Sequence, residues 1–193
     1  MDAQLFDISY LNLFTGLFVV VLLAGLLVRF WLAGRQMRHV AWRREHVPEA
    51  FAGVISQAAH QKAAAYTIAK NQFDLWSSVY SAAILIGWTL LGGLGLLNYT
   101  LLERIEHPMW QQLSLLAAFF LINGLLELPL GWFQTFRLEE RFGFNKSTIG
   151  LWLGDIVKGT VMAAVIGLSL AALFLWLMQE AGSLWWLWAW GIW

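Results

Sequence analysis

The sequence predicts an all-α protein, a multi-pass transmembrane helical bundle, from its composition, its long uncharged stretches and the placement of its basic residues. Hydrophobic residues make up 60% of the 193 residues and charged residues only 12%, against about 25% charged residues in soluble domains. This composition is typical of a membrane protein, so we expect the lipid bilayer to be a partner. The formal net charge is zero, so the excess of basic residues typical of nucleic-acid-binding proteins is absent, and we expect no nucleic-acid partner.

Four stretches contain no Asp, Glu, Lys or Arg: residues 8–28, 75–102, 107–126 and 159–179. A helix rises about 1.5 Å per residue and the hydrocarbon core is about 30 Å thick. Each stretch has 20 residues or more and is therefore long enough to cross the bilayer. Residues 181–193 are also uncharged but number only 13. The prediction is four full spans plus a truncated fifth.

The basic residues predict the orientation of these spans. Residues 34–73 hold six of the 12 Lys and Arg residues, and residues 136–150 hold three more, whereas the loop between the second and third stretches holds Arg104 alone. Because Lys and Arg concentrate in cytoplasmic loops, we expect residues 34–73 to form a cytoplasmic loop and helix, residues 136–150 a cytoplasmic hairpin, and the N-terminus to lie outside.

Residues 136–150 read as a charged hairpin between two apolar helices. Gly143 and Asn145 suit a tight reversal, because Gly and Asn tolerate positive φ. Ser147 or Thr148 can then cap the next helix by accepting a hydrogen bond from a free backbone N–H.

Three charged residues, Glu127, Asp155 and Lys158, lie near the inner ends of the two apolar helices joined by this hairpin and are expected to be within the membrane. Charges within a bilayer are costly and usually face a bundle interior or a water-filled cavity, so these residues could form the wall of a polar chamber that contacts a substrate. Alternatively, Asp155 and Lys158 neutralise each other, and Glu127 binds backbone groups freed by Pro129. Both interpretations remain open at this point.

The four histidines, His39, His46, His60 and His107, do not form a metal-binding motif. None has the His-Glu-x-x-His spacing that sets two imidazoles one helical turn apart, and there is no cysteine. We therefore expect neither a bound metal nor a catalytic residue in this chain.

Residues 47–73, 128–148 and 151–159 resemble the N-terminal membrane region of the CAAX prenyl protease 1 family, which are integral-membrane zinc metalloendopeptidases. The run LEERFGFNKST, residues 138–148, is the most specific part of the resemblance. The resemblance implies a helical bundle around a large hydrated chamber. It also implies that the zinc ligands, His-Glu-x-x-His and a later glutamate, belong to a catalytic domain expected after residue 193.

On this resemblance, residues 1–193 form a single N-terminal membrane domain that is inactive alone, and zinc belongs to the full-length enzyme. The expected partners are the C-terminal metalloprotease half and a peptide or membrane-protein substrate, and the expected location is a bacterial inner membrane. The candidates for chamber or docking roles are Glu127, Glu139, Glu140, Arg141, Asn145, Lys146, Asp155 and Lys158.

Two other classes of function compete with this one. In a small stand-alone transporter or channel component, Glu127, Asp155 and Lys158 would line a path across the membrane. In a non-catalytic membrane scaffold, the charged residues would serve assembly only.

Overall fold

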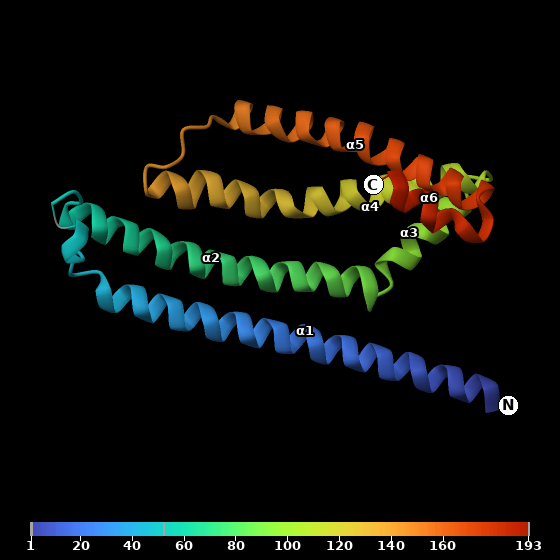
Figure 1. The fold of residues 1–193 in the computed structure, drawn as a ribbon, viewed down its shortest axis with the longest axis horizontal. Helices are drawn as coiled ribbons and strands as arrows, with labels where there is room; N and C mark the ends of the chain where they lie inside the picture. Colours follow the sequence, from blue (N-terminus) through green and yellow to red (C-terminus); the bar gives the residue numbers. More distant parts are fainter. Residues whose placement is uncertain (1, 52, 193) are drawn as a thin grey trace. The chain divides into compact units, whose positions relative to one another are not determined.

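The computed structural model describes residues 2–51 and 53–192, and it is built from helices (Figure 1). No strand occurs in these residues, so the predicted all-α class is confirmed. The α-helices are α1 (Asp2–Arg43), α2 (Gln57–Thr89), α3 (Gly93–Leu102), α4 (Pro108–Phe133), α5 (Ile149–Glu180) and α6 (Trp185–Ile192). Shorter turns of helix occur at Glu49–Phe51, Gln134–Glu139 and Gly182–Leu184.

The long helices match the predicted spans. Leu13–Arg43, Pro108–Glu139 and Ile149–Glu180 are each long and apolar enough to cross a membrane, and the pair Gln57–Thr89 and Gly93–Leu102 adds a fourth crossing if its two helices form one span bent by 46°. The residues of the predicted fifth span form the turn Gly182–Leu184 and the eight-residue helix α6.

The segment 34–73, predicted to be a cytoplasmic loop and helix, is more helical than a loop. α1 runs without a break past the expected end of the first span to Arg43, because residues 29–43 contain no proline and are rich in good helix formers. After Pro48 the chain makes one 3₁₀ turn, and α2 begins where Ser56 Oγ accepts a hydrogen bond from Ala59 N at 3.2 Å. The helix expected in this segment therefore continues directly into the second span.

The second span is divided at a glycine. Gly92 has a φ of 78°, a left-handed conformation that glycine adopts without steric cost. The chain leaves α2 at Leu90 and starts α3 at Gly93. The cluster of glycines thus produces a defined bend.

The third span passes through a proline. Pro129 lies inside α4, and the helix continues beyond it into the π-helical segment Gln134–Glu139, hereafter η2. Proline removes one helical hydrogen bond, and a π-helical turn is a rare variant found mostly as a local bulge within an α-helix. η2 leads directly into the turn of the charged hairpin predicted at residues 136–150. This turn, Glu139–Lys146, is called the charged turn below.

The chain divides into two units, and each is described by itself. The first consists of Met1–Leu91 and Leu130–Asn145, and the second of Gly92–Pro129 and Lys146–Trp193. In the first unit, α1 and α2 lie side by side and antiparallel (Figure 1), and the end of α4 packs on α2 through Phe133, whose ring stacks on Phe73 at 5.8 Å. In the second unit, Gln111 Nε2 on α4 donates a hydrogen bond to Asn98 Oδ1 on α3 at 2.8 Å.

Most large apolar side chains lie on the outside of the helices. Phe14 is 72% exposed and Leu125 64%, whereas the buried apolar side chains of the described residues are only Ala64, Ala82, Leu138, Phe142 and Leu177. Apolar surface of this extent is stable only against lipid or further protein. Two of the few buried apolar side chains, Leu138 and Phe142, belong to the charged turn and the helix that leads into it.

Candidate functional site

The charged turn after α4 has a defined backbone. Gly143 has a φ of 74°, its N–H bonds to Glu140 O at 2.9 Å, and the N–H of Phe144 bonds to Glu139 O at 2.9 Å. These two bonds around a left-handed glycine form the Schellman motif that ends many helices. The reversal predicted at Gly143 is therefore confirmed.

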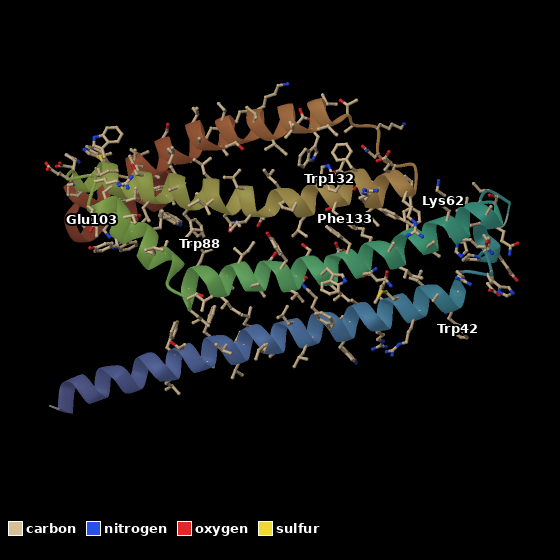
Figure 2. All side chains as sticks on the ribbon, turned by 180° about the vertical axis from the view of Figure 1, so that it is seen from behind. Trp42, Lys62, Trp88, Glu103, Trp132 and Phe133 are labelled. Atoms are coloured by element: carbon tan, nitrogen blue, oxygen red, sulfur yellow. The ribbon has the colours of Figure 1, made fainter. Side chains whose placement is uncertain are left out.

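Two phenylalanines fix this turn to α2. The ring of Tyr66 meets the rings of Phe142 and Phe144 edge to face, with centroids 5.3 and 4.8 Å away. Lys62 Nζ lies 5.6 Å from the centre of the Phe144 ring, and Figure 2 labels Lys62 on α2. Since aromatic pairs of this geometry contribute about 0.5–1.5 kcal/mol each beyond burial, the turn is held by its aromatic side chains.

The charged groups of the turn, apart from Glu139, are exposed. Glu140 and Arg141 are exposed, and the Arg141 guanidinium lies over the Phe142 ring at 5.6 Å. Glu139 and Asn145 are half-buried: Glu139 Oε1 accepts a hydrogen bond from Gln134 Nε2 at 3.5 Å, and the Asn145 N–H bonds to Glu139 O at 3.4 Å. Four of the predicted site residues are thus brought together on one anchored turn.

The helix that follows the turn starts as predicted. Thr148 Oγ1 accepts a hydrogen bond from Leu151 N at 3.3 Å and caps α5. Lys146, the fifth predicted residue of this segment, is exposed on the connection before the cap.

The three charges associated with the spans are all exposed side chains of the second unit. Glu127 Oε1 accepts a hydrogen bond from the side chain of Asn123 at 3.2 Å, so its partner is an amide one turn away and not a backbone group freed by Pro129. Within the described residues, Asp155 and Lys158 form no ion pair with each other, and no hydrogen bond joins either to Glu127. The two interactions of the alternative interpretation, an Asp155–Lys158 ion pair and a contact of Glu127 with backbone groups near Pro129, are therefore not seen in the described residues.

The described ranges, residues 2–51 and 53–192, contain no group of three His, Asp or Glu side chains that could hold a metal ion. The residues present there do not fit a zinc centre, which needs three or four such ligands. We derive no chemical step through zinc on this chain.

A polar contact between α1 and α2 was not predicted from the sequence. Arg29 Nη1 donates a hydrogen bond to Ser78 Oγ at 2.7 Å, across 49 positions of sequence. The signal was present in the spacing of Asn71, Asp74, Ser78 and Ser81, which recur every three or four residues and so share one face of a helix.

Long apolar helices joined by an aromatic-anchored charged turn define a multi-pass helical membrane domain. Residues 36–193 match the family model described as the CAAX prenyl protease N-terminal region with five membrane helices, and the chain belongs to this family. It is an integral membrane protein, and the resemblance predicted from its sequence is confirmed.

Relatives from several eukaryotes agree with this assignment. The chain is 30% identical to the human CAAX prenyl protease 1 homolog over 185 residues, which cover 90% of the chain and 38% of the relative. It is 32% identical to the CAAX prenyl protease 1 of Saccharomyces cerevisiae over 139 residues, covering 67% and 31%. The crystal structure of S. mikatae Ste24p superimposes with a TM-score of 0.75 at 26% identity, covering 84% of this chain and 39% of that one. The chain thus spans about a third of the length of these relatives.

Proposed function

We propose that this chain is the membrane-embedded N-terminal part of a CAAX prenyl protease-like zinc metalloendopeptidase, forming part of the substrate-chamber wall and the docking surface for a C-terminal metalloprotease half. The observation that carries the proposal is the turn Glu139–Lys146, which is held by Tyr66 while Glu140, Arg141 and Lys146 are exposed. An anchored turn loses little conformational entropy on binding, and the exposed carboxylate of Glu140 and guanidinium of Arg141 can pair with complementary charges on the partner.

The second part of the proposal concerns the chamber wall. Glu127, Asp155 and Lys158 are exposed side chains on apolar helices, and charges at such positions usually face water-filled cavities. Since they are not paired with one another in the described residues, they are available to a peptide or membrane-protein substrate. The names of the relatives favour a prenylated one.

The chemistry is assigned to the other half of the enzyme. The matched part covers only 31% of the S. cerevisiae relative, and the described residues of this chain offer no zinc ligand set. We therefore assign zinc, and the water that it activates, to the C-terminal half, whereas this chain encloses and orients the substrate.

Joining this chain to the remaining part of the S. cerevisiae relative is expected to give a protease that cleaves a farnesylated peptide and loses that activity with a chelator. In this chimera, Glu140→Gln with Arg141→Gln is expected to lower kcat/KM about tenfold, because two interface charge pairs of modest strength are lost. The matched control is Glu103→Gln with Arg104→Gln, an exposed pair of the same residues on the loop after α3.

Three results would contradict the proposal. The first is stoichiometric, tight zinc binding by the 193-residue chain alone. The second is an equal loss of activity in the control pair, and the third is ion flux through liposomes that contain only this chain and that Glu127→Gln abolishes. The last result would favour a transporter or channel.

We also propose that residues 34–73 and 136–150 are cytoplasmic, because basic residues concentrate in these segments. The membrane proposed for the chain is a bacterial inner membrane. The absence of cysteine allows single-cysteine labelling on a clean background. In intact bacterial cells, a membrane-impermeant maleimide is expected to label Glu106→Cys, but Glu49→Cys only after the cells are permeabilised. The reverse pattern would overturn the proposed orientation.

A further inference from the structure

A groove lies between α1 and α2 in the first unit, with a volume of about 1040 Å³. Its polar lining comes from Arg29, Arg35 and His39 on α1 and from Asn71, Asp74 and Ser78 on α2. Arg29 and Ser78 lie at the ends of the uncharged residues 8–28 and 75–102, where a polar group on a membrane helix is usually functional, and Arg35, His39 and Asn71 continue the groove into the segment 34–73. This groove is distinct from the charged turn and from the residues proposed for the chamber wall.

One hydrogen-bond chain holds the arginine at the centre of the groove. Arg29 Nη1 donates to Ser78 Oγ at 2.7 Å, and Ser78 Oγ donates to the carbonyl of Asp74 at 2.6 Å. Ser78 is only 8% exposed, whereas Arg29 itself is exposed. Because a guanidinium carries five N–H donors in a fixed plane, it keeps donors for a ligand after bonding to the serine.

The charge of the groove favours an anion. The lining contains two arginines, Arg29 and Arg35, and a single carboxylate, that of Asp74, so positive charges outnumber negative ones. Arg35 is additionally positioned over the Trp31 ring at 5.8 Å. Planar guanidinium groups bind phosphate oxygens in bidentate geometry.

The rest of the lining favours a ligand with a hydrocarbon part. Val28, Leu32 and Leu75 line the same groove. Arg29 directly follows the uncharged residues 8–28, which as a helix span about 31 Å, the thickness of the hydrocarbon core. Arg29 and the neighbouring Leu32 and Leu75 therefore lie at the depth of the lipid headgroups, and the lining residues Gly25 and Val28 lie at the depth of the acyl chains.

We infer that this groove binds one anionic glycerophospholipid, with its phosphodiester on Arg29 and Arg35, its glycerol backbone beside Leu32 and Leu75, and an acyl chain along Val28 and Gly25. Basic pockets between membrane helices recognise anionic headgroups through the same charge pairing. The bound lipid would fill the space between α1 and α2 and connect the two helices at the membrane surface. The site requires neither zinc nor protease activity.

Native mass spectrometry of the purified 193-residue chain in detergent, titrated with phosphatidylglycerol, tests the inference. One phosphatidylglycerol is expected to remain bound, and Arg29→Gln is expected to weaken its affinity at least fivefold. Arg38→Gln removes the same charge from the same helix, but Arg38 does not line the groove. The affinity of this variant for phosphatidylglycerol is therefore expected to stay within twofold of that of the unchanged chain.

Two further variants keep the result interpretable if Arg29→Gln does not fold. Arg29→Lys retains the positive charge and is expected to retain more affinity than Arg29→Gln, and Arg35→Gln is expected to weaken binding at least threefold while the Ser78 bond stays intact. Helical circular dichroism of each variant reports folding.

Three outcomes would overturn the inference. Arg38→Gln could weaken binding as much as Arg29→Gln, which would make the effect one of net charge. Zwitterionic phosphatidylcholine could bind as tightly as phosphatidylglycerol, so that no anion is selected. Finally, soluble glycerol 3-phosphate could displace the lipid at equal concentration, which would show that the site binds a free phosphate group and does not require a lipid.

Discussion

Replacing Phe142 by alanine is expected to destabilise the first unit by about 3–5 kcal/mol, the usual cost of removing a buried phenylalanine ring. The side chain is 8% exposed and its ring meets Tyr66 edge to face at 5.3 Å. Arg141 covers its face at 5.6 Å. Tryptophan fluorescence during heating of the purified chain should show a lower unfolding midpoint, and the amides of the turn should exchange hydrogen faster.

Phe144→Ala is the matched control for this substitution. Phe144 also contacts Tyr66, with centroids 4.8 Å apart, but it is 52% exposed. Because about half as much apolar area of this ring is buried as for Phe142, the expected loss of unfolding free energy is only about 1 kcal/mol. If both substitutions lowered the unfolding midpoint equally, the larger stabilising contribution assigned to the buried Phe142 ring would be wrong.

The membrane spans could be predicted from the sequence because a bilayer restricts the backbone conformation of an apolar segment. Without water to satisfy its backbone, such a segment must be helical, and its length in residues sets its length in ångströms. The end of α1 could not be predicted in the same way. The loss of apolar residues after Val28 marks the membrane surface, but a helix can continue into water, and α1 continues to Arg43.

In the charged turn, too, the backbone conformation could be predicted from neighbouring residues, but the contacts with distant residues could not. The left-handed conformation of Gly143 follows from residue type alone. Its contact with Tyr66 and Lys62 joins distant parts of the chain and has no local signal. The spacing of Asp155 and Lys158 permits an ion pair on one helix face, but exposed side chains gain little from such pairs, and the two described side chains do not form one.

The groove between α1 and α2 shows that the hydrogen-bond partner of a polar side chain is harder to predict than its location in a membrane span. Ser78 lies within a predicted span, which indicates that a polar partner exists, because a buried hydroxyl needs one. The partner is Arg29, 49 residues away. Only the antiparallel packing of α1 on α2 brings the two side chains together (Figure 1).

Replacing Gly143 by valine is expected to destabilise the turn by about 2 kcal/mol, since a left-handed conformation costs L-residues roughly 1–2 kcal/mol and β-branched residues more. The cause is the backbone, with a φ of 74°, because an added Cβ would meet only Lys62 Nζ at an ordinary 3.7 Å. The N–H of Phe144 bonds to Glu139 O at 2.9 Å and should lose protection from hydrogen exchange by about thirtyfold, the equivalent of 2 kcal/mol.

Gly154→Val separates this backbone effect from the effect of added volume. Gly154 lies in α5, where a Cβ would have nothing within 4 Å, and valine has a slightly better helix propensity than glycine. Its unfolding midpoint is therefore expected to stay level or rise. If the two valine variants lost stability equally, added bulk and not the left-handed backbone of the turn would explain both results. In the chimeric protease, Gly143→Val should also lower activity, because displacing the turn moves Glu140 and Arg141 away from the proposed docking surface.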